Sequence, residues 1–188
     1  MNASPTLTDG RPSNRALALF KASNDELEQV MLRGETPDFE QLAGWEFRGR
    51  NVAFWADRAP IRKFIKGFYK DGAGRGMGYN VPVVQNPDAE RWIAKPRDDQ
   101  PKRFGFYTVG PVDAGSKENA YLQALLLNYS EGGNFPLDPS NVLRDYLVRV
   151  LPGSDDLILG KAFLALGPAR VASNYFVLER HRETDYRV

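Results

Sequence analysis

The chain has 188 residues, of which 42% are hydrophobic and 26% are charged, so it is long enough for one domain with a buried core. It has no cysteine and one histidine, which excludes disulfides, thiolate metal sites and zinc sites with two histidine ligands. The net charge of +1 provides no field that would attract nucleic acid or an anionic membrane. We therefore expect no nucleic-acid partner, no metal and no cofactor.

The beginning of the chain is polar and contains prolines and a glycine. Residues 1–13 predict a flexible tail, followed by a single domain over residues 14–188. The tail lacks the apolar segment of a signal peptide. The longest apolar run, residues 120–127, is too short to span a bilayer. We expect a cytoplasmic protein without a membrane span.

The first regular segment is helical by its spacing. Apolar residues recur every three or four positions over residues 16–32. Ser23 and Glu26 have the spacing of a capping box, which favours two short helices over one. Another short helix is expected from Pro37 to Leu42. Residues 45–55 then predict the first strand.

The next segment, Pro60–Lys70, predicts an amphipathic helix that serves as a lid or plug. Its apolar residues recur at helical spacing, with Lys and Arg between them: Ile61, Phe64, Ile65 and Phe68. The glycine-rich segment Gly72–Gly78 follows. It lacks the glycine spacing of a dinucleotide-binding loop, so a hinge or a tight turn is favoured over phosphate binding. Together the helix and this segment are expected to gate a ligand site.

The rest of the chain is a series of strand-like runs separated by turn residues. The expected strands are 79–84, 91–94, 104–109, 120–129, 142–151, 156–166 and 171–180. The last two, joined by Gly167 and Pro168, predict a β-hairpin. With the first strand the count is about eight, the number at which a closed barrel can hold one small ligand. We expect a mainly β fold: an antiparallel barrel of eight or more strands with N-terminal helices and one lid helix.

Five tyrosines recur on these strands: Tyr107, Tyr121, Tyr129, Tyr146 and Tyr175. Four of them, with one arginine, are the candidate ligand-binding residues. Hydroxyl groups in an apolar cavity are typical of a hydrophobic-ligand site, although tyrosine is also an ordinary strand residue. An arginine in an apolar strand could hold a ligand carboxylate; the alternatives are an ion pair with a neighbouring acid or exposure. The candidate ligand-binding residues are Tyr107, Tyr121, Arg144, Tyr146 and Tyr175.

The first and last strands of a closed barrel are neighbours. Trp45 and Arg180 are therefore expected to stack and close one end of the barrel, a structural role.

His181 lies between Arg180 and Arg182, whose charges lower its pKa and keep the imidazole neutral. A neutral imidazole could bind haem iron, but a surface position is favoured. We assign no catalytic residue.

Four segments carry a family resemblance: Leu42–Gly49, Phe64–Phe68, Leu159–Phe163 and Tyr175–Arg180. With these segments the chain resembles the lipocalin-like (calycin) barrels, in particular a microbial family of unknown function named for its Gly-x-Trp-x-Gly motif. The resemblance implies a barrel fold with an interior site. Similar barrels bind fatty acids, retinoids, pigments or haem, and a few act as decarboxylases or cyclases.

Three functions follow from this fold. We expect a non-catalytic binder of a small hydrophobic or amphipathic molecule inside the barrel. One alternative is an enzyme of decarboxylase, isomerase or cyclase type that uses Tyr, Glu or Arg, which requires a polar cluster in the cavity. The other is a structural or interaction protein whose barrel is filled by its own side chains. Ligand identity, homodimer formation and haem at His181 are left open.

Overall fold

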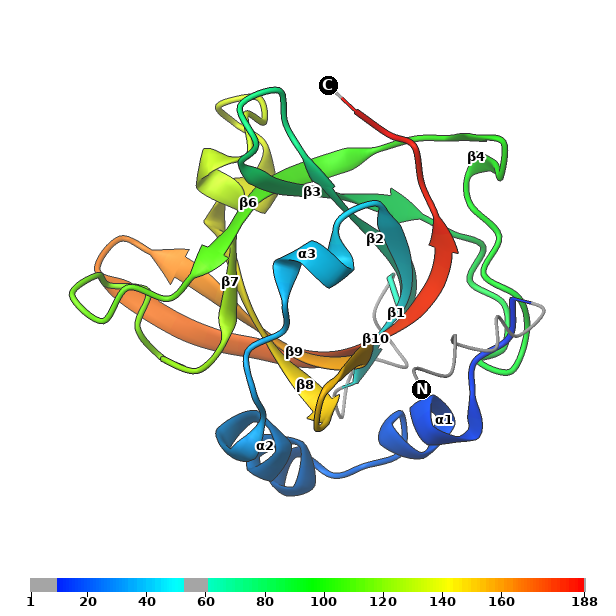
Figure 1. Cartoon of the computed structure of the whole chain (residues 1–188), viewed down its shortest axis with the longest axis horizontal. Helices are drawn as coiled ribbons and strands as arrows, with labels where there is room; N and C mark the ends of the chain where they lie inside the picture. The colour runs from blue at the N-terminus through cyan, green and yellow to red at the C-terminus, as the bar shows by residue number, and fades with distance from the viewer. Residues whose placement is uncertain (1–9, 53–60, 188) are drawn as a thin grey trace.

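Most of the chain forms the wall of a closed β-barrel. The structure, a computed structural model, describes residues 10–52 and 61–187. Eight strands of this described part close in the order β1-β10-β9-β8-β7-β6-β3-β2, each antiparallel to its neighbours (Figure 1). They are β1 (Trp45–Val52), β2 (Lys63–Lys70), β3 (Gly76–Pro82), β6 (Phe104–Pro111), β7 (Leu125–Asn128), β8 (Leu143–Leu151), β9 (Ser154–Leu166) and β10 (Ala169–Glu183). The other elements are the helices α1 (Asn14–Leu19), α2 (Asn24–Arg33) and α3 (Phe39–Leu42), the 3-10 helices η2 (Tyr129–Glu131) and η3 (Pro139–Val142), and the short strands β4 (Pro96–Arg97) and β5 (Gln100–Pro101).

The barrel closes where the first and last strands meet. β1 pairs with β10 from Trp45 opposite Glu183 to Val52 opposite Tyr175. The predicted C-terminal hairpin is β9 with β10. Closure satisfies the hydrogen bonds that an open sheet would leave at its edges. The predicted closed antiparallel barrel is therefore confirmed.

The N-terminal helices pack on the outside of this wall (Figure 1). Two short helices form, as the capping box indicates, because Ser23 accepts from the backbone of Glu26 while Glu26 accepts from the backbone of Ser23. Leu27 and Met31 of α2 are fully buried against the barrel. None of the helices in the described residues is both long and apolar enough to cross a membrane.

Helix α3 lies across one end of the barrel (Figure 1). Its Leu42 is fully buried in the same interior cluster as Phe47 of β1 and Phe68 of β2. The turn after the helix is fixed by Gly44, which has a φ of 84° and donates its N–H to the carbonyl of Phe68 at 2.8 Å. The protein's own side chains therefore fill this end of the interior.

The predicted lid helix is wrong. Within Pro60–Lys70, Pro60 lies outside the described residues and Lys63–Lys70 forms β2, between β1 and β3. Residues 63–69 are all buried, since one side of the strand faces the barrel interior and the other is covered from outside. A strand buried on both faces lacks the regular alternation of apolar and polar residues, and the apolar residues Phe64, Ile65 and Phe68 of β2 then have the spacing of a helix. Residues 63–70 belong to the barrel wall and cannot move as a lid.

The glycine-rich segment is a tight turn followed by a strand. Asp71 donates its N–H to the carbonyl of Arg75 at 3.1 Å, and Gly74 between them has a φ of 78°. β3 then begins at Gly76, beside Phe39 of α3. The turn therefore lies at the end of the barrel that α3 closes. From there it cannot gate a ligand site at the opposite end of the barrel.

Two expected strands differ from the structure. Residues 91–94 form only a single bridge, Val83 with Ala94, and of residues 120–129 only Leu125–Asn128 form a strand. The barrel has eight strands, as expected, but one of the eight expected strands is wrong: β2 belongs to the barrel and residues 91–94 do not. Residues 1–9 of the expected tail and 53–55 of the expected first strand lie outside the described residues.

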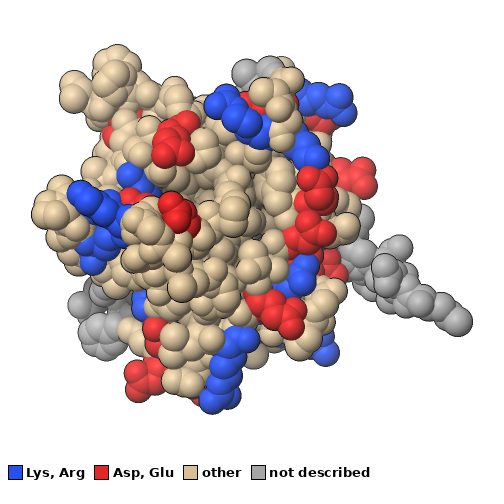
Figure 2. All heavy atoms as spheres, turned by 60° about the vertical axis from the view of Figure 1, so that its left-hand side comes forward, with Lys and Arg blue, Asp and Glu red and all other residues tan. Residues whose placement is uncertain are grey.

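The outer face in Figure 2 carries charges of both signs around a mostly uncharged middle, as the net charge of +1 suggests.

Glu28 ties α2 to the barrel wall. Its carboxylate accepts hydrogen bonds from Lys161 Nζ at 2.6 Å, from Tyr121 Oη at 2.7 Å and from Tyr175 Oη. Burial raises the pKa of Glu28, but these hydrogen bonds outweigh it and leave the pKa below its ordinary value. The carboxylate is thus the form that the folded protein prefers.

The stabilisation from Glu28 should depend on pH. Because its pKa is lower in the folded than in the unfolded chain, the stabilisation is fully present above the unfolded value of about 4.3 and is lost as pH falls through the folded value. We expect Glu28→Gln to lower the free energy of unfolding by about 1 kcal/mol at pH 7 and by progressively less below pH 5. Urea denaturation at a series of pH values measures this. Glu40→Gln, in an exposed pair with Lys70, is the control; a Glu28 effect that is constant with pH would contradict the prediction.

Candidate functional site

The barrel interior contains a cavity of about 190 Å³ at the end opposite α3. Its lining comes from the far end of β1, the beginning of β2 and the far end of β3, which are remote from the α3 end of each strand. At its border Ile61 is 50% exposed, so the cavity reaches the surface. Its apolar walls are Ile61, Phe64, Phe104, Leu143, Ala162 and Phe176.

One wall of the cavity carries a buried ion pair. Lys66 of β2 and Asp145 of β8 lie with Nζ and Oδ2 3.0 Å apart, and their side chains are only 3% and 4% exposed. Lys66 points inward because strand side chains alternate and its neighbours Phe64 and Phe68 lie in the interior cluster. By the same alternation Asp145 points inward beside Leu143. Desolvating two charges is costly, so such a pair needs further hydrogen bonds to be stable.

Asn80 of β3 and Tyr129 of η2 supply those hydrogen bonds. Lys66 Nζ donates to Asn80 Oδ1 at 3.0 Å and to Tyr129 Oη. Tyr129 Oη donates in turn to Asp145 Oδ2 at 3.0 Å. Only a charged ammonium has three protons for the three acceptors around Nζ. The geometry therefore holds Lys66 in its protonated form.

The surroundings of Nζ are otherwise aromatic, which shapes the electrostatics of the site. Burial lowers the pKa of Lys66, and the carboxylate of Asp145 opposes that shift. Burial, together with Asp145, raises the pKa of Tyr129 well above its ordinary value of 10.0, so its hydroxyl stays neutral. Ring centroids lie 4.8–5.6 Å from Nζ for Tyr107, Tyr129, Phe176 and Phe64. Opposite charges cancel within the pair, and a ligand in this cavity meets no net charge.

Of the five candidate ligand-binding residues, only Tyr107 lies inside the barrel. Its Oη donates to the carbonyl of Gly67 at 3.1 Å, and it packs on Tyr129 with ring centroids 5.0 Å apart, beneath the cavity lining. Tyr121, Arg144, Tyr146 and Tyr175 lie on the outer side of the wall, and none of them lines the cavity.

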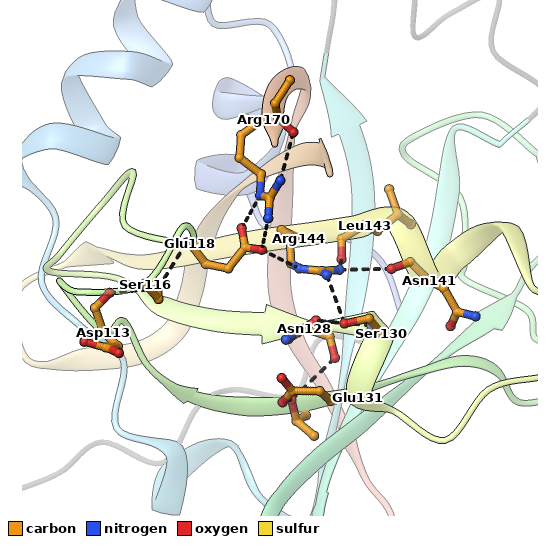
Figure 3. A network of polar contacts seen from close by, with 12 residues as sticks. Asp113, Ser116, Glu118, Asn128, Ser130, Glu131, Asn141, Leu143, Arg144 and Arg170 are labelled. Carbon is orange, nitrogen blue, oxygen red and sulfur yellow. Dashed lines mark hydrogen bonds and ion pairs between the residues drawn. The ribbon is translucent and has the colours of Figure 1, made fainter. Parts of the chain in front are cut away.

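Arg144 is held by an ion-pair network on that outer side (Figure 3). Its Nε donates to Glu118 Oε1 at 3.1 Å and its Nη2 to Ser130 Oγ at 2.9 Å. Arg170 of β10 donates to the same carboxylate through Nε and Nη2, both at 2.6 Å. Pairing with an acidic neighbour was one of the alternatives for Arg144, and the structure shows that pairing. Glu118 thereby fastens its loop to β8 and β10.

The structure brings the three outer tyrosines into one neighbourhood. Tyr121 and Tyr146 pack with ring centroids 5.6 Å apart, and the hydroxyls of Tyr121 and Tyr175 both donate to Glu28. These contacts attach α2 and the β6–β7 loop to the barrel. A ligand-binding role for these three tyrosines stays a prediction, and none of them lines the cavity.

Trp45 and Arg180 are in contact at the α3 end. The guanidinium carbon of Arg180 lies 4.7 Å from the centroid of the Trp45 ring, and Arg180 also donates to the carbonyl of Gln41 at 2.9 Å. His181, the next residue, alternates to the outer side. Burial and the charges of Arg48 and Arg182 lower its pKa to about 4, which keeps the imidazole neutral as the flanking arginines suggest.

Tyr129 of the polar wall is one of the strand tyrosines, although it is not among the candidate ligand-binding residues. The other three residues of the wall were missed by the sequence reasoning: Lys66, Asn80 and Asp145. A signal for two of them exists. Lys66 interrupts the inward series of Phe64 and Phe68, and Asp145 interrupts the series of Leu143 and Leu147. A charged residue at the centre of an apolar strand face must be paired or functional. The helical interpretation of residues 60–70 hid the first of these two signals.

No protein-family model matches the chain, and no curated protein matches it. The closed antiparallel barrel of eight strands is consistent with the lipocalin-like fold that the resemblance implies.

Proposed function

We propose that this barrel binds a small amphipathic molecule in the cavity opposite α3. The observation that carries the proposal is a cavity with aromatic and aliphatic walls and one polar side, where Lys66 and Asp145 are buried. Apolar walls favour binding by about 25 cal/mol per Å² of ligand surface removed from water. The few polar groups of such a site fix the orientation of the ligand. The same barrel supports membership of the Gly-x-Trp-x-Gly family, which is part of this proposal.

The size of the cavity limits the ligand. An engineered apolar cavity of about 150 Å³ in another protein binds benzene. A cavity of about 190 Å³ therefore fits one ring with a short substituent and is too small for a long acyl chain. A purely structural protein would have its whole barrel filled by its own side chains. Here they fill the α3 end of the interior, but the opposite end contains the cavity.

Binding is favoured over catalysis by the state of the polar side chains. Lys66, Tyr129 and Asp145 are the kind of cluster that an enzyme would need. All three protons of the Lys66 ammonium are already donated, and the Tyr129 hydroxyl is donated to Asp145. Neither Lys66 nor Tyr129 is available as a base or nucleophile without breaking this network, which leaves Asp145 as the one member with an acceptor atom to spare. The cluster is suited to orienting a ligand.

Occupation of the cavity can be tested by filling it. The probe is 4-methylphenol, added to the wild-type protein while backbone amide resonances are followed by NMR. We expect resonances of β2, β8 and β9 at the cavity to shift, and Ala162→Leu to weaken binding at least tenfold because Ala162 lines the cavity. Ala165→Leu, on the same strand but outside the lining, is the matched control.

Two results would count against the proposal. One is a wild-type protein in which neither 4-methylphenol nor toluene shifts any resonance at the cavity. The other is an Ala162→Leu variant that keeps a native spectrum and wild-type affinity. If Ala162→Leu does not fold, Ala162→Val provides the same test with a smaller side chain.

A further inference from the structure

The hydrogen-bonding capacity of the polar wall is almost fully used. Lys66 Nζ donates to Asn80, Tyr129 and Asp145. Asn80 Nδ2 donates to the carbonyl of Gly105 at 2.9 Å, while its Oδ1 accepts from Lys66. Tyr129 Oη donates to Asp145 and accepts from Lys66. No donor of these three side chains points unpaired into the cavity.

The exception is one carboxylate oxygen. Both contacts of Asp145 are made by Oδ2, and within residues 10–52 and 61–187 no hydrogen bond or ion pair reaches Oδ1. The residue is 97% buried, since its exposed fraction is 3%, and it lines the cavity. Oδ1 is not fully enclosed by protein atoms, because Asp145 lines the cavity, but a carboxylate oxygen in so narrow a space is poorly hydrated. A ligand that donates a hydrogen bond to it would supply the partner that the protein does not.

We propose that the cavity selects an uncharged, single-ring ligand that carries a hydrogen-bond donor, such as a phenol, and that this donor binds Asp145 Oδ1. The inference rests on the proposed function, because it names the class of molecule that the same cavity takes. The ring would lie among Phe64, Phe104 and Phe176, which line the cavity on the apolar side. A hydroxyl group is the smallest substituent that supplies the donor.

Charged ligands fit the same wall poorly. An anion finds no free donor, because the Lys66 ammonium is fully used, and it would face the Asp145 carboxylate. A cation would reach Asp145 but would lie beside the Lys66 ammonium, which is 3.0 Å from Oδ2. Either ion would also lose its hydration in an apolar cavity. An acceptor without a donor, such as an ether, would meet the carboxylate oxygen with a lone pair.

A matched set of ligands tests this selection: 4-methylphenol, toluene, 4-methylanisole, 4-methylbenzoate and 4-methylbenzylamine. All five share the same ring and differ in the polar group. Calorimetry or NMR titration against the wild-type protein gives their dissociation constants. We expect 4-methylphenol to bind at least tenfold more tightly than each of the other four, a difference of about 1.4 kcal/mol.

A double variant separates the acceptor from the cavity. Lys66→Met with Asp145→Leu removes both charges. We expect toluene still to bind this variant, and we expect 4-methylphenol and toluene to have about the same dissociation constant. The inference is overturned if toluene or 4-methylanisole binds the wild type as tightly as 4-methylphenol, if either charged ligand binds most tightly, or if the preference survives in the double variant. If none of the five ligands binds the wild type, the proposed function itself fails. If the double variant does not fold, the wild-type ranking alone decides.

Discussion

Replacing Lys66 with methionine is expected to lower the free energy of unfolding by about 3–5 kcal/mol, the largest effect of any single change considered for this protein. The substitution keeps the length of the side chain but leaves Asp145 as an unpaired charge among Phe64, Phe176 and Tyr129. Both partners are at most 4% exposed, so water in the narrow cavity compensates for only part of the loss. Urea denaturation of wild type and variant gives the difference in free energy, with the m-value as a check that both unfold from equally compact states.

Two comparisons make this prediction specific to the buried pair. Lys70→Met removes a cation from the same strand, but its pair with Glu40 is exposed, at 43% and 64% of side-chain surface, so we expect a change within about 0.5 kcal/mol. Lys66→Met combined with Asp145→Leu removes both charges and is expected to be at least about 1 kcal/mol more stable than Lys66→Met alone. A Lys66→Met variant that loses less than about 1 kcal/mol would show that Asp145 does not depend on this partner.

Gly160→Ala is expected to cost about 1–3 kcal/mol and to weaken ligand binding as well. Gly160 of β9 lies opposite Phe176 of β10, and a Cβ atom there would lie 2.1 Å from Phe176 Cζ and 2.2 Å from Cε2. The ring cannot turn aside freely, because it packs on Phe64 with centroids 5.8 Å apart. It would be displaced toward the cavity, which both aromatic rings line.

Stability and ligand affinity should therefore change together in this variant. Urea denaturation gives the first quantity, and titration with 4-methylphenol gives the second, for which we expect at least a threefold loss. Gly110→Ala on β6 is the control, because no atom lies within 4 Å of the Cβ position and we expect a change within about 0.5 kcal/mol. A Gly160→Ala variant as stable as the wild type would mean that the ring moves without cost.

The fold was more predictable than the site because its signals are local. The Ser23 capping box, the short α3 and the C-terminal hairpin depend on residues that are neighbours in the sequence, and each was confirmed. The site depends on which face of a strand a residue occupies. Arg144 and Asp145 are adjacent, and a step of one residue moves a side chain from the outer to the inner face. Of these two residues Arg144 is the predicted ligand-binding residue, but Asp145 lines the cavity.

An antiparallel barrel with capped N-terminal helices can be predicted from the amino-acid sequence alone, since turn residues, caps and strand propensity act over a few residues. The tertiary structure decided that residues 63–70 form a barrel strand, because burial on both faces removes the alternation by which a strand is recognised. It also decided the site. Lys66 is tolerated in the interior only because closure of the barrel brings Asp145, Asn80 and Tyr129 to it. Pairing between strands far apart in the sequence leaves no local pattern, and the attraction and hydrogen bonds that offset the cost of desolvating Lys66 exist only inside the closed barrel.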